Sequence, residues 1–288
     1  MKALITGARG QVGRLLLETR PADMEAVALT HLDLDIANAR AVSECILRER
    51  PELIINAAAY TAVDRAESEP EAARVINAEG PANLACAAKD IGARLIHIST
   101  NFVFDGKAST PYRPDAPTNP LSVYGKTKRE GEVAVVQLLG ARAAIVRTAW
   151  VYAAHGANFM HTMLRVMRAR GEVRVVADQV GTPTCARSLA HALWHIAARQ
   201  EIHGTHHWTD AGVASWYDFA VAIAEEGAQL GLLPPTVSVT AIATEEYPTP
   251  ARRPPYSVLD KRTLTSIGLM ARHWRYRLRE VMKELPHV

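Results

Sequence analysis

The sequence has few cysteines and no long apolar run, and both absences restrict what the protein can be. Its three cysteines, Cys45, Cys86 and Cys185, are widely spaced among 288 residues and form no metal-binding pattern. Such cysteine use indicates a reducing compartment. No stretch approaches the roughly 18–20 apolar residues that span a bilayer, and the glycines of residues 7–13 interrupt the apolar N-terminal segment. We therefore expect a cytoplasmic protein with no membrane partner.

An excess of charge of one sign is also absent. The formal net charge is +3, with no long basic run, so a nucleic-acid partner is not expected. Internal repeats and low-complexity tracts are absent as well. With 48% hydrophobic residues, the chain can bury a large core in one or two domains, as a monomer or a homodimer.

The N-terminal segment reads as a strand, a glycine turn and a helix. An apolar run at residues 2–6 is followed by Gly7, Gly10 and Gly13, and then by three leucines. Glycines in this setting provide a tight turn, close approach to a pyrophosphate and close packing of helix on sheet. The helix N-terminus then offers free N–H groups to phosphates. A turn without a ligand is the alternative, but its position directly after a strand favours dinucleotide binding.

The first half of the chain alternates strands with helices. Strands are predicted at 2–6, 26–30, 53–56, 95–100 and 144–147, and helices at 39–50 and 71–90 and around Tyr124. Nearly continuous apolar strands alternating with helices indicate a parallel sheet covered on both faces. The expected fold class is α/β, with a Rossmann-type doubly wound sheet in residues 1–150. Residues 151–288 are expected to form a smaller α/β substrate domain, with some segments returning to the first.

Polar and small residues follow two of the predicted strands. Ala57, Ala58 and Ala59 follow one strand end, and Ser99 and Thr100 close another. Ligands bind at the carboxyl ends of strands in such sheets. The alanines allow a flat cofactor to approach the backbone, although tight packing would use the same small residues.

Tyr124 and Lys128 are four residues apart, a spacing that puts both side chains on one face of a helix. A nearby lysine charge lowers the pKa of a tyrosine from its usual value of about 10. The Thr100 hydroxyl can add a hydrogen bond to a substrate oxygen. Together these groups could protonate a carbonyl oxygen while a hydride reaches its carbon. The spacing alone is common in helices.

Two features of the second half have open interpretations. Arg252 and Arg253 lie among four prolines, which restrict the backbone and could preset the arginines for phosphate; a solvated surface turn is the alternative. His203, His206 and His207 could suggest a metal, but adjacent histidines point to opposite faces of a strand. We interpret them as an exposed strand end and expect no metal site.

Several segments resemble one known family over nearly the whole chain. They are Gly-x-x-Gly-x-x-Gly at 7–13, Asn-Ala-Ala-Ala-Tyr at 56–60, Ser-Thr at 99–100, Tyr-Gly-Lys-Thr-Lys at 124–128, Arg-Thr-Ala-Trp at 147–150, Asn-Phe at 158–159, Asp-Gln-Val-Gly-Thr-Pro-Thr at 178–184 and Tyr-Pro-Thr-Pro-Ala-Arg-Arg-Pro at 247–254. The chain is similar to the dTDP-4-dehydrorhamnose reductases, which are extended short-chain dehydrogenases/reductases. The glycine and Tyr-Lys motifs indicate only the superfamily, whereas the later segments are more specific.

The resemblance implies that NADPH or NADH delivers hydride to C4 of dTDP-4-dehydro-L-rhamnose, giving dTDP-L-rhamnose. Tyr124 would donate the proton, Lys128 would hold the nicotinamide ribose and lower the tyrosine pKa, and Thr100 would bind the reacting oxygen. Cofactor binding is expected at Gly7, Gly10, Gln11, Val12, Gly13, Thr30, His31, Asp35, Ile36, Ala57, Ala58, Ala59, Ser99, Tyr124 and Lys128. Substrate binding is expected at Thr100, Asn101, Trp150, Asn158, Gln179 and Arg253.

Two departures from the family pattern affect these expectations. Asn101 and Phe102 replace the family's usual aspartate and tyrosine beside the C4 site. Thr30 and His31 stand where an acidic residue would favour NADH, so we expect NADPH to be used at least as well. The alternatives are another nucleotide-sugar reductase or epimerase, or a non-catalytic subunit resembling the regulatory subunit of methionine adenosyltransferase. A dehydratase is disfavoured because Asn101 and Phe102 cannot replace its Asp-Glu pair.

Overall fold

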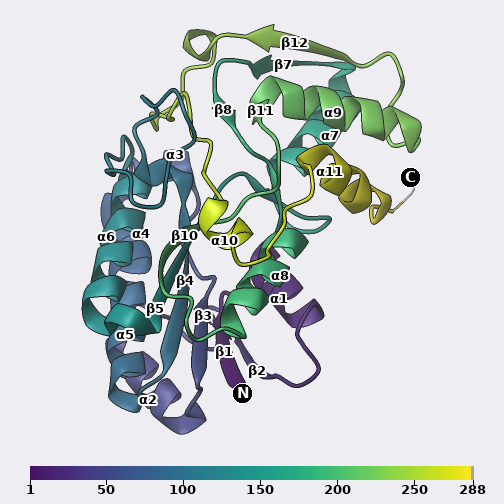
Figure 1. The fold of residues 1–288 in the computed structure, drawn as a ribbon. Helices are drawn as coiled ribbons and strands as arrows, with labels where there is room; N and C mark the ends of the chain where they lie inside the picture. Colours follow the sequence, from purple (N-terminus) through teal and green to yellow (C-terminus); the bar gives the residue numbers. More distant parts are fainter. Residues whose placement is uncertain (287–288) are drawn as a thin grey trace.

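The computed structural model describes residues 1–286 and is built around a six-stranded sheet (Figure 1). The strand order is β10-β5-β4-β3-β1-β2, and every neighbouring pair is parallel. The strands are β1 (Lys2–Thr6), β2 (Glu25–Leu29), β3 (Leu53–Asn56), β4 (Arg94–Thr100), β5 (Ala143–Thr148) and β10 (Gly204–His207). The order reverses direction between β1 and β3, where ligands bind in sheets of this kind. The predicted parallel α/β fold is confirmed.

Helices cover both faces of this sheet, as Figure 1 shows. One face carries α2 (Ala39–Glu49), α5 (Gly80–Ile91) and α6 (Val123–Leu139), and the other carries α1 (Gln11–Glu18) and α8 (Ala186–Ala197). The four inner strands β1, β3, β4 and β5 are buried almost throughout, for example Ile54 and Ile55 at 0% exposure, whereas the edge strands β2 and β10 are partly exposed. Burial on both faces explains why these strands read as continuous apolar runs instead of alternating patterns.

The helix predicted at 71–90 is interrupted in the structure. It consists of α4 (Pro70–Arg74), one π-helical turn at Val75–Glu79, and α5. The turn contains the buried Asn77, whose amide exchanges two hydrogen bonds with the backbone of Tyr60 and donates a third to Thr127. Turns of this kind often lie at functional sites. Here Asn77 fixes the loop that follows β3.

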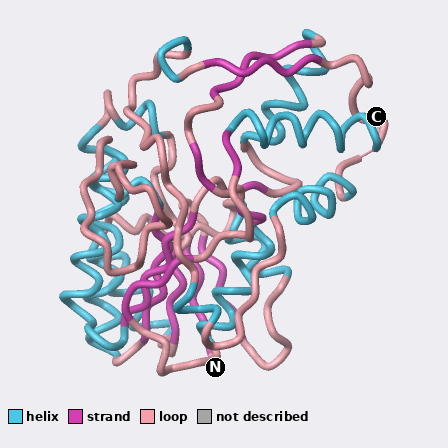
Figure 2. The backbone as a smooth tube through the Cα atoms, turned by 45° about the horizontal axis from the view of Figure 1, so that its top comes forward, coloured by secondary structure: helices cyan, strands magenta, loops and turns pink. Residues whose placement is uncertain are grey.

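A smaller layer of helices and strands lies above the carboxyl ends of the sheet. It contains α7 (Phe159–Arg170), α9 (Trp216–Gln229), α11 (Trp274–Lys283) and the parallel pair β7 (Glu172–Val176) and β12 (Ser238–Ile242). Figure 2 shows that pair at the top, apart from the central strands. Its core gathers Phe219, Met160 and Leu278. The shorter elements are α3 (Val63–Ala66), α10 (Arg262–Thr265), β6 (Val151–Tyr152), β8 (Val180–Gly181), β9 (Thr184–Cys185) and β11 (Ala214–Ser215).

Two segments of the second half belong to the first layer. Strand β10 pairs with β5 in the central sheet, and α8 packs on α1, where the Trp194 indole donates to the Leu16 carbonyl at 3.0 Å. The interpretation of residues 203–207 as an exposed strand end is therefore wrong for His207. That side chain is 0% exposed, and burial together with the charge of Arg147 lowers its pKa to about 3.

Nowhere in residues 1–286 does a helix combine the length and apolar character that crossing a membrane requires.

Candidate active site

The turn between β1 and α1 has the shape that a pyrophosphate needs. Gly7 has a positive φ of 69°, and a Cβ on Gly13 would lie 2.2 Å from the Gly7 carbonyl oxygen. Gly10 is the N-cap of α1 and makes no side-chain hydrogen bond to the helix, so the first N–H groups of the helix stay free for an anion. The turn therefore leaves a concave backbone surface, free of side chains, that fits the phosphates of a dinucleotide.

We expect Gly13→Ala to weaken NADPH binding at least about tenfold, equivalent to about 1.4 kcal/mol. The added methyl would meet the backbone atoms of Gly7 and Ala8, which must shift. Fluorescence titration of NADPH measures the change. Gly171→Asn is the control, because that exposed glycine has open space around it and asparagine tolerates its positive φ. Equal affinity in Gly13→Ala and wild type would contradict this role for the turn.

The end of β2 carries an acidic group that was not expected from the sequence. The Asp33 carboxylate folds back and accepts hydrogen bonds from the Thr30 N–H at 2.9 Å and the Thr30 hydroxyl at 2.6 Å. These two bonds hold the pKa of Asp33 below its usual value, with a smaller contribution from Arg9 in the glycine turn. In the sequence, the signal for this turn was an aspartate three residues after a threonine, a spacing at which the carboxylate can accept hydrogen bonds from the threonine. His31 is exposed beside this turn.

The remaining residues expected beside the cofactor differ in accessibility. Ala57, Ala58 and Ala59 follow β3 and are partly exposed. The Ala57 backbone packs closely on Gly7, because a Cβ on Gly7 would lie 2.7 Å from the Ala57 carbonyl group. Asp35 caps its own turn by accepting from the Ala37 N–H. Ile36 is buried against Gly80 of α5. Its side chain is therefore part of the core.

Thr100, Tyr124 and Lys128 are brought together at the carboxyl end of β4. Thr100 ends the strand, while Tyr124 and Lys128 lie in the first two turns of α6. The helix can approach the strand end because Gly125 has no side chain. A Cβ at that position would lie 2.3 Å from the Phe102 carbonyl oxygen. The Thr100 hydroxyl donates to Asn101 Oδ1 and accepts the Phe102 N–H, both at 3.2 Å, and it lies beside the Tyr124 phenol. The expected grouping of hydroxyl, phenol and amine is present.

The expectation that Lys128 lowers the pKa of Tyr124 is wrong in this structure. Burial raises the pKa of Tyr124, and the neighbouring Thr100 hydroxyl opposes that rise only in part. The Lys128 amine points away, donating to the Ile98 carbonyl at 2.7 Å with His97 Nε2 at 3.3 Å. Burial lowers the pKa of Lys128 to about 8, against an opposing effect of Glu132.

Below the site, a buried ion pair fixes α6 to the sheet. Glu132 lies two turns after Tyr124 on the same face and accepts from Arg147 Nε and NH2 of β5, both at 2.8 Å. Ser99 donates its hydroxyl to Glu132 at 2.5 Å. The Ser99 side chain is therefore committed to this network inside the protein.

Beyond the carboxyl end of β5, two tryptophans stack on each other. Trp150 follows β5 with φ of 48°, a conformation that a bulky side chain rarely adopts and that is often held at functional sites. Its ring stacks on Trp216 with centroids 3.6 Å apart and planes 9° from parallel. Trp216 was missed from the sequence, where the only signal was an aromatic residue directly after the helix cap Ser215.

The comparisons with known proteins agree over the whole chain. The family model described as the RmlD substrate binding domain matches residues 1–286. The chain belongs to the RmlD family. A dTDP-4-dehydrorhamnose reductase of Burkholderia thailandensis is 41% identical, covering 99% of each chain. A crystal structure of a dTDP-4-dehydrorhamnose reductase from Clostridium acetobutylicum superposes with a TM-score of 0.93 at 43% identity, covering 98% of this chain and 99% of that one. The reductase of Bacillus anthracis, solved in complex with NADP, gives 0.91 at 36% identity, with the same coverage.

In this RmlD family member, the other expected substrate residues hold the structure together. Asn158 caps α7 and donates to Gln11 at 2.9 Å, joining α7 to the helix that follows the glycine turn. Gln179 donates to Thr244. Arg253 forms a two-point ion pair with Asp64, at 2.9 and 2.7 Å. Asn101 is buried with its amide nitrogen unpartnered. Any contact of these residues with substrate stays a prediction.

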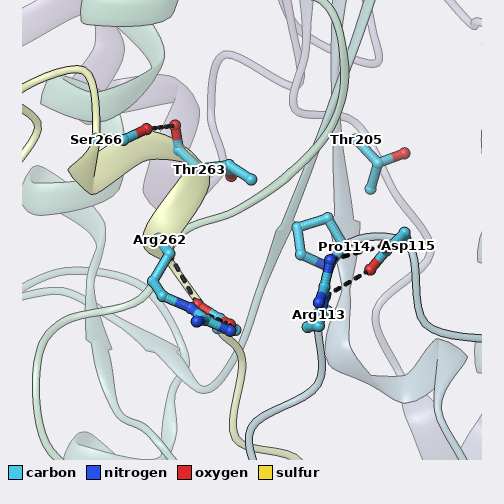
Figure 3. A pocket seen from close by; sticks show the side chains of 8 residues that line it. Arg113, Pro114, Asp115, Thr205, Arg262, Thr263 and Ser266 are labelled. Atoms are coloured by element: carbon cyan, nitrogen blue, oxygen red, sulfur yellow. Dashed lines mark hydrogen bonds and ion pairs between the residues drawn. The ribbon is translucent and has the colours of Figure 1, made fainter.

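A surface pocket of about 730 Å³ lies apart from this site, between α10 and the segment before α6 (Figure 3). Arg113 pairs with Asp115 at 3.1 Å, and Arg262 pairs with Asp260 at 2.6 Å. Each arginine is therefore neutralised by its own neighbour. None of the expected site residues lines the pocket, so it has no part in the proposed chemistry.

Proposed function

We propose that the protein reduces the C4 keto group of dTDP-4-dehydro-L-rhamnose to dTDP-L-rhamnose, with NADPH as hydride donor and NADH as the alternative donor. The observation that carries this proposal is the grouping of Thr100 at the carboxyl end of β4 with Tyr124 in the first turn of α6 and Lys128 one turn further along that helix. The relatives of matching length named as this reductase support the substrate. Retention of all three residues argues against a purely regulatory subunit.

The residues divide the work of the reaction. The glycine turn and the N-terminus of α1 hold the cofactor phosphates, and NADPH, when bound, supplies the hydride. Tyr124 Oη then gives its proton to the oxygen developing at C4, while Thr100 holds that oxygen through its hydroxyl. Such positioned acid catalysis is worth about 10²–10⁴-fold in rate. The raised pKa of Tyr124 keeps the phenol protonated at neutral pH, as an acid requires.

The two layers suit different ligands. The central sheet with its helices, including α8 and β10, would bind the cofactor, and the upper layer with Trp150 and Trp216 would bind the nucleotide sugar. The division at residue 150 is therefore crossed by two segments, and residues 287–288 of the second range lie outside the described residues. A cytoplasmic location and a monomeric or dimeric state stay predictions from the sequence.

The direct test supplies dTDP-4-dehydro-L-rhamnose and follows NADPH absorbance. We expect steady consumption of NADPH and formation of dTDP-L-rhamnose. Binding of NADPH without turnover would contradict the proposal and favour the non-catalytic alternative. Turnover of only a different nucleotide sugar would keep the chemistry and change the substrate.

The acidic turn after β2 gives the cofactor preference a sharper test. We expect kcat/KM with NADPH to equal or exceed that with NADH, because Asp33 is engaged by Thr30 and Arg9 is exposed beside it. Arg9→Ala should raise KM for NADPH several-fold, on the order of 1 kcal/mol, since a phosphate loses a charged partner. KM for NADH is the internal control and should change little. A wild-type preference for NADH would contradict the expectation.

A further inference from the structure

The side chain of Asn56 has only one orientation that satisfies its neighbours. It is 0% exposed at the end of β3, and its Oδ1 accepts from the Ala58 N–H at 3.1 Å and from the Thr6 hydroxyl at 2.7 Å. A backbone N–H can only donate, so the oxygen of the amide must face Ala58. The Asn56 nitrogen therefore faces the opposite way, toward His97 at 3.0 Å.

This orientation determines where His97 carries its proton. The Asn56 Nδ2 atom is a donor, so His97 Nδ1 must accept with its lone pair. The ring is 0% exposed, and burial holds its pKa well below the usual value. A neutral ring that accepts at Nδ1 carries its hydrogen on Nε2.

That hydrogen points at Lys128. The distance from His97 Nε2 to Lys128 Nζ is 3.3 Å, and the amine is also within 2.7 Å of the Ile98 carbonyl. An ammonium has three donors and no acceptor, so it would place a donor against the Nε2–H. A neutral amine has a lone pair that can accept the Nε2–H while still donating to Ile98. The contact is a hydrogen bond only for the amine.

The other charged groups around Lys128 do not remove this bias. On α6, Glu132 favours the ammonium, but its charge is already shared by Arg147 of β5 and by Arg129. Tyr124, one turn earlier on α6, is protonated. Asn56 of β3 is uncharged, and His97 is the group of β4 that faces the amine. Burial works in the same direction as His97, with Lys128 only 2% exposed.

We propose that His97, oriented by Asn56, is a positioning residue that favours the neutral amine of Lys128 over the ammonium. This inference rests on the proposed function, which places Lys128 in the reactive group. When the ammonium loses a proton to water, an N–H bond breaks, and the lone pair left on Nζ accepts the hydrogen bond from His97 Nε2.

The test is nuclear magnetic resonance of the cofactor-free full chain, labelled with ¹⁵N at histidine and ¹³C at lysine. The His97 signals are assigned by their loss in His97→Gln, and those of Lys128 by their loss in Lys128→Met. We expect His97 to carry its proton on Nε2 at neutral pH and Lys128 to titrate well below the usual lysine value of about 10.4. A proton on Nδ1, or a normal lysine titration, would overturn the proposal in the wild-type protein alone.

Asn56→Asp then tests the cause. The carboxylate keeps the bonds from Ala58 and Thr6 but accepts at the former nitrogen position, so the His97 proton should move to Nδ1. The exposed lone pair on Nε2 would then accept from the ammonium, and the Lys128 titration should rise by about one pH unit or more, a tenfold change in proton affinity.

Thr6→Val is the matched control, because it removes one bond to Asn56 and leaves the Ala58 N–H to orient the amide. It should leave both the tautomer and the titration unchanged. A Lys128 titration that stays put in Asn56→Asp would overturn the proposal. These readouts need no turnover, so they are separate from success or failure of the reductase assay.

Discussion

Tyr124→Phe is expected to lower kcat for dTDP-4-dehydro-L-rhamnose by at least about 10²-fold, while the affinity for NADPH is retained. The substitution removes the only atom that Tyr124 can use to protonate the C4 oxygen. The ring itself should stay in place, because its edge contact with Phe102, at 5.5 Å between centroids, involves the part that phenylalanine keeps. Steady-state kinetics and a separate NADPH titration measure the two quantities.

Tyr276→Phe is the matched control for this experiment. It removes the same hydroxyl from a tyrosine on α11 that is 54% exposed, and it should leave kcat unchanged. Wild-type rates in Tyr124→Phe would show that the phenol is not the acid. A loss of NADPH affinity equal to the loss of rate would instead show that the variant disrupts the cofactor site.

Arg147→Met is expected to lower the free energy of unfolding by about 3–5 kcal/mol, the cost of leaving a buried charge without its partner. The side chains of Arg147 and Glu132 are 3% and 1% exposed, and the pair is joined at two points. After the change, Glu132 keeps only Ser99 and the half-buried Arg129. Denaturant unfolding followed by circular dichroism measures the loss.

Arg40→Met provides the comparison, because it breaks an ion pair with Glu44 whose side chains are 88% and 62% exposed. That change should cost no more than about 0.5 kcal/mol. Adding Glu132→Gln to Arg147→Met should recover part of the stability, since the unpaired charge is then removed. Equal losses in Arg40→Met and Arg147→Met would contradict the account of the network.

The sheet and its switch point could be predicted because they depend on local patterns. Five strands were placed within one residue at each end. Four of them are buried on both faces and nearly all apolar, and the fifth, the edge strand β2, is partly exposed but also apolar after Glu25. The glycine turn and the Tyr124–Lys128 spacing were found for the same reason. Strand β10 was not assigned to the sheet, because Gly204–His207 reads as polar and joins the sheet only through its pairing with β5.

What the sequence did not reveal depends on contacts between distant segments. The stacking of Trp150 on Trp216 joins residues 66 positions apart. The π-helical turn places the Asn77 amide where it forms two hydrogen bonds with the backbone of Tyr60. The pKa of Tyr124 was expected to fall because helical spacing gives proximity to Lys128. The structure raises it instead, because spacing does not tell where the amine points or how deeply the phenol is buried.

The central claim is hydride transfer to C4, and deuterium transfer tests it most directly. The protein is incubated with dTDP-4-dehydro-L-rhamnose and NADPH that carries deuterium at both positions of nicotinamide C4, and the product is examined by nuclear magnetic resonance. We predict dTDP-L-rhamnose with deuterium at C4 of the sugar, and a greatly reduced yield with Tyr124→Phe. Unlabelled product, or no product from a protein that binds both ligands, would contradict the account.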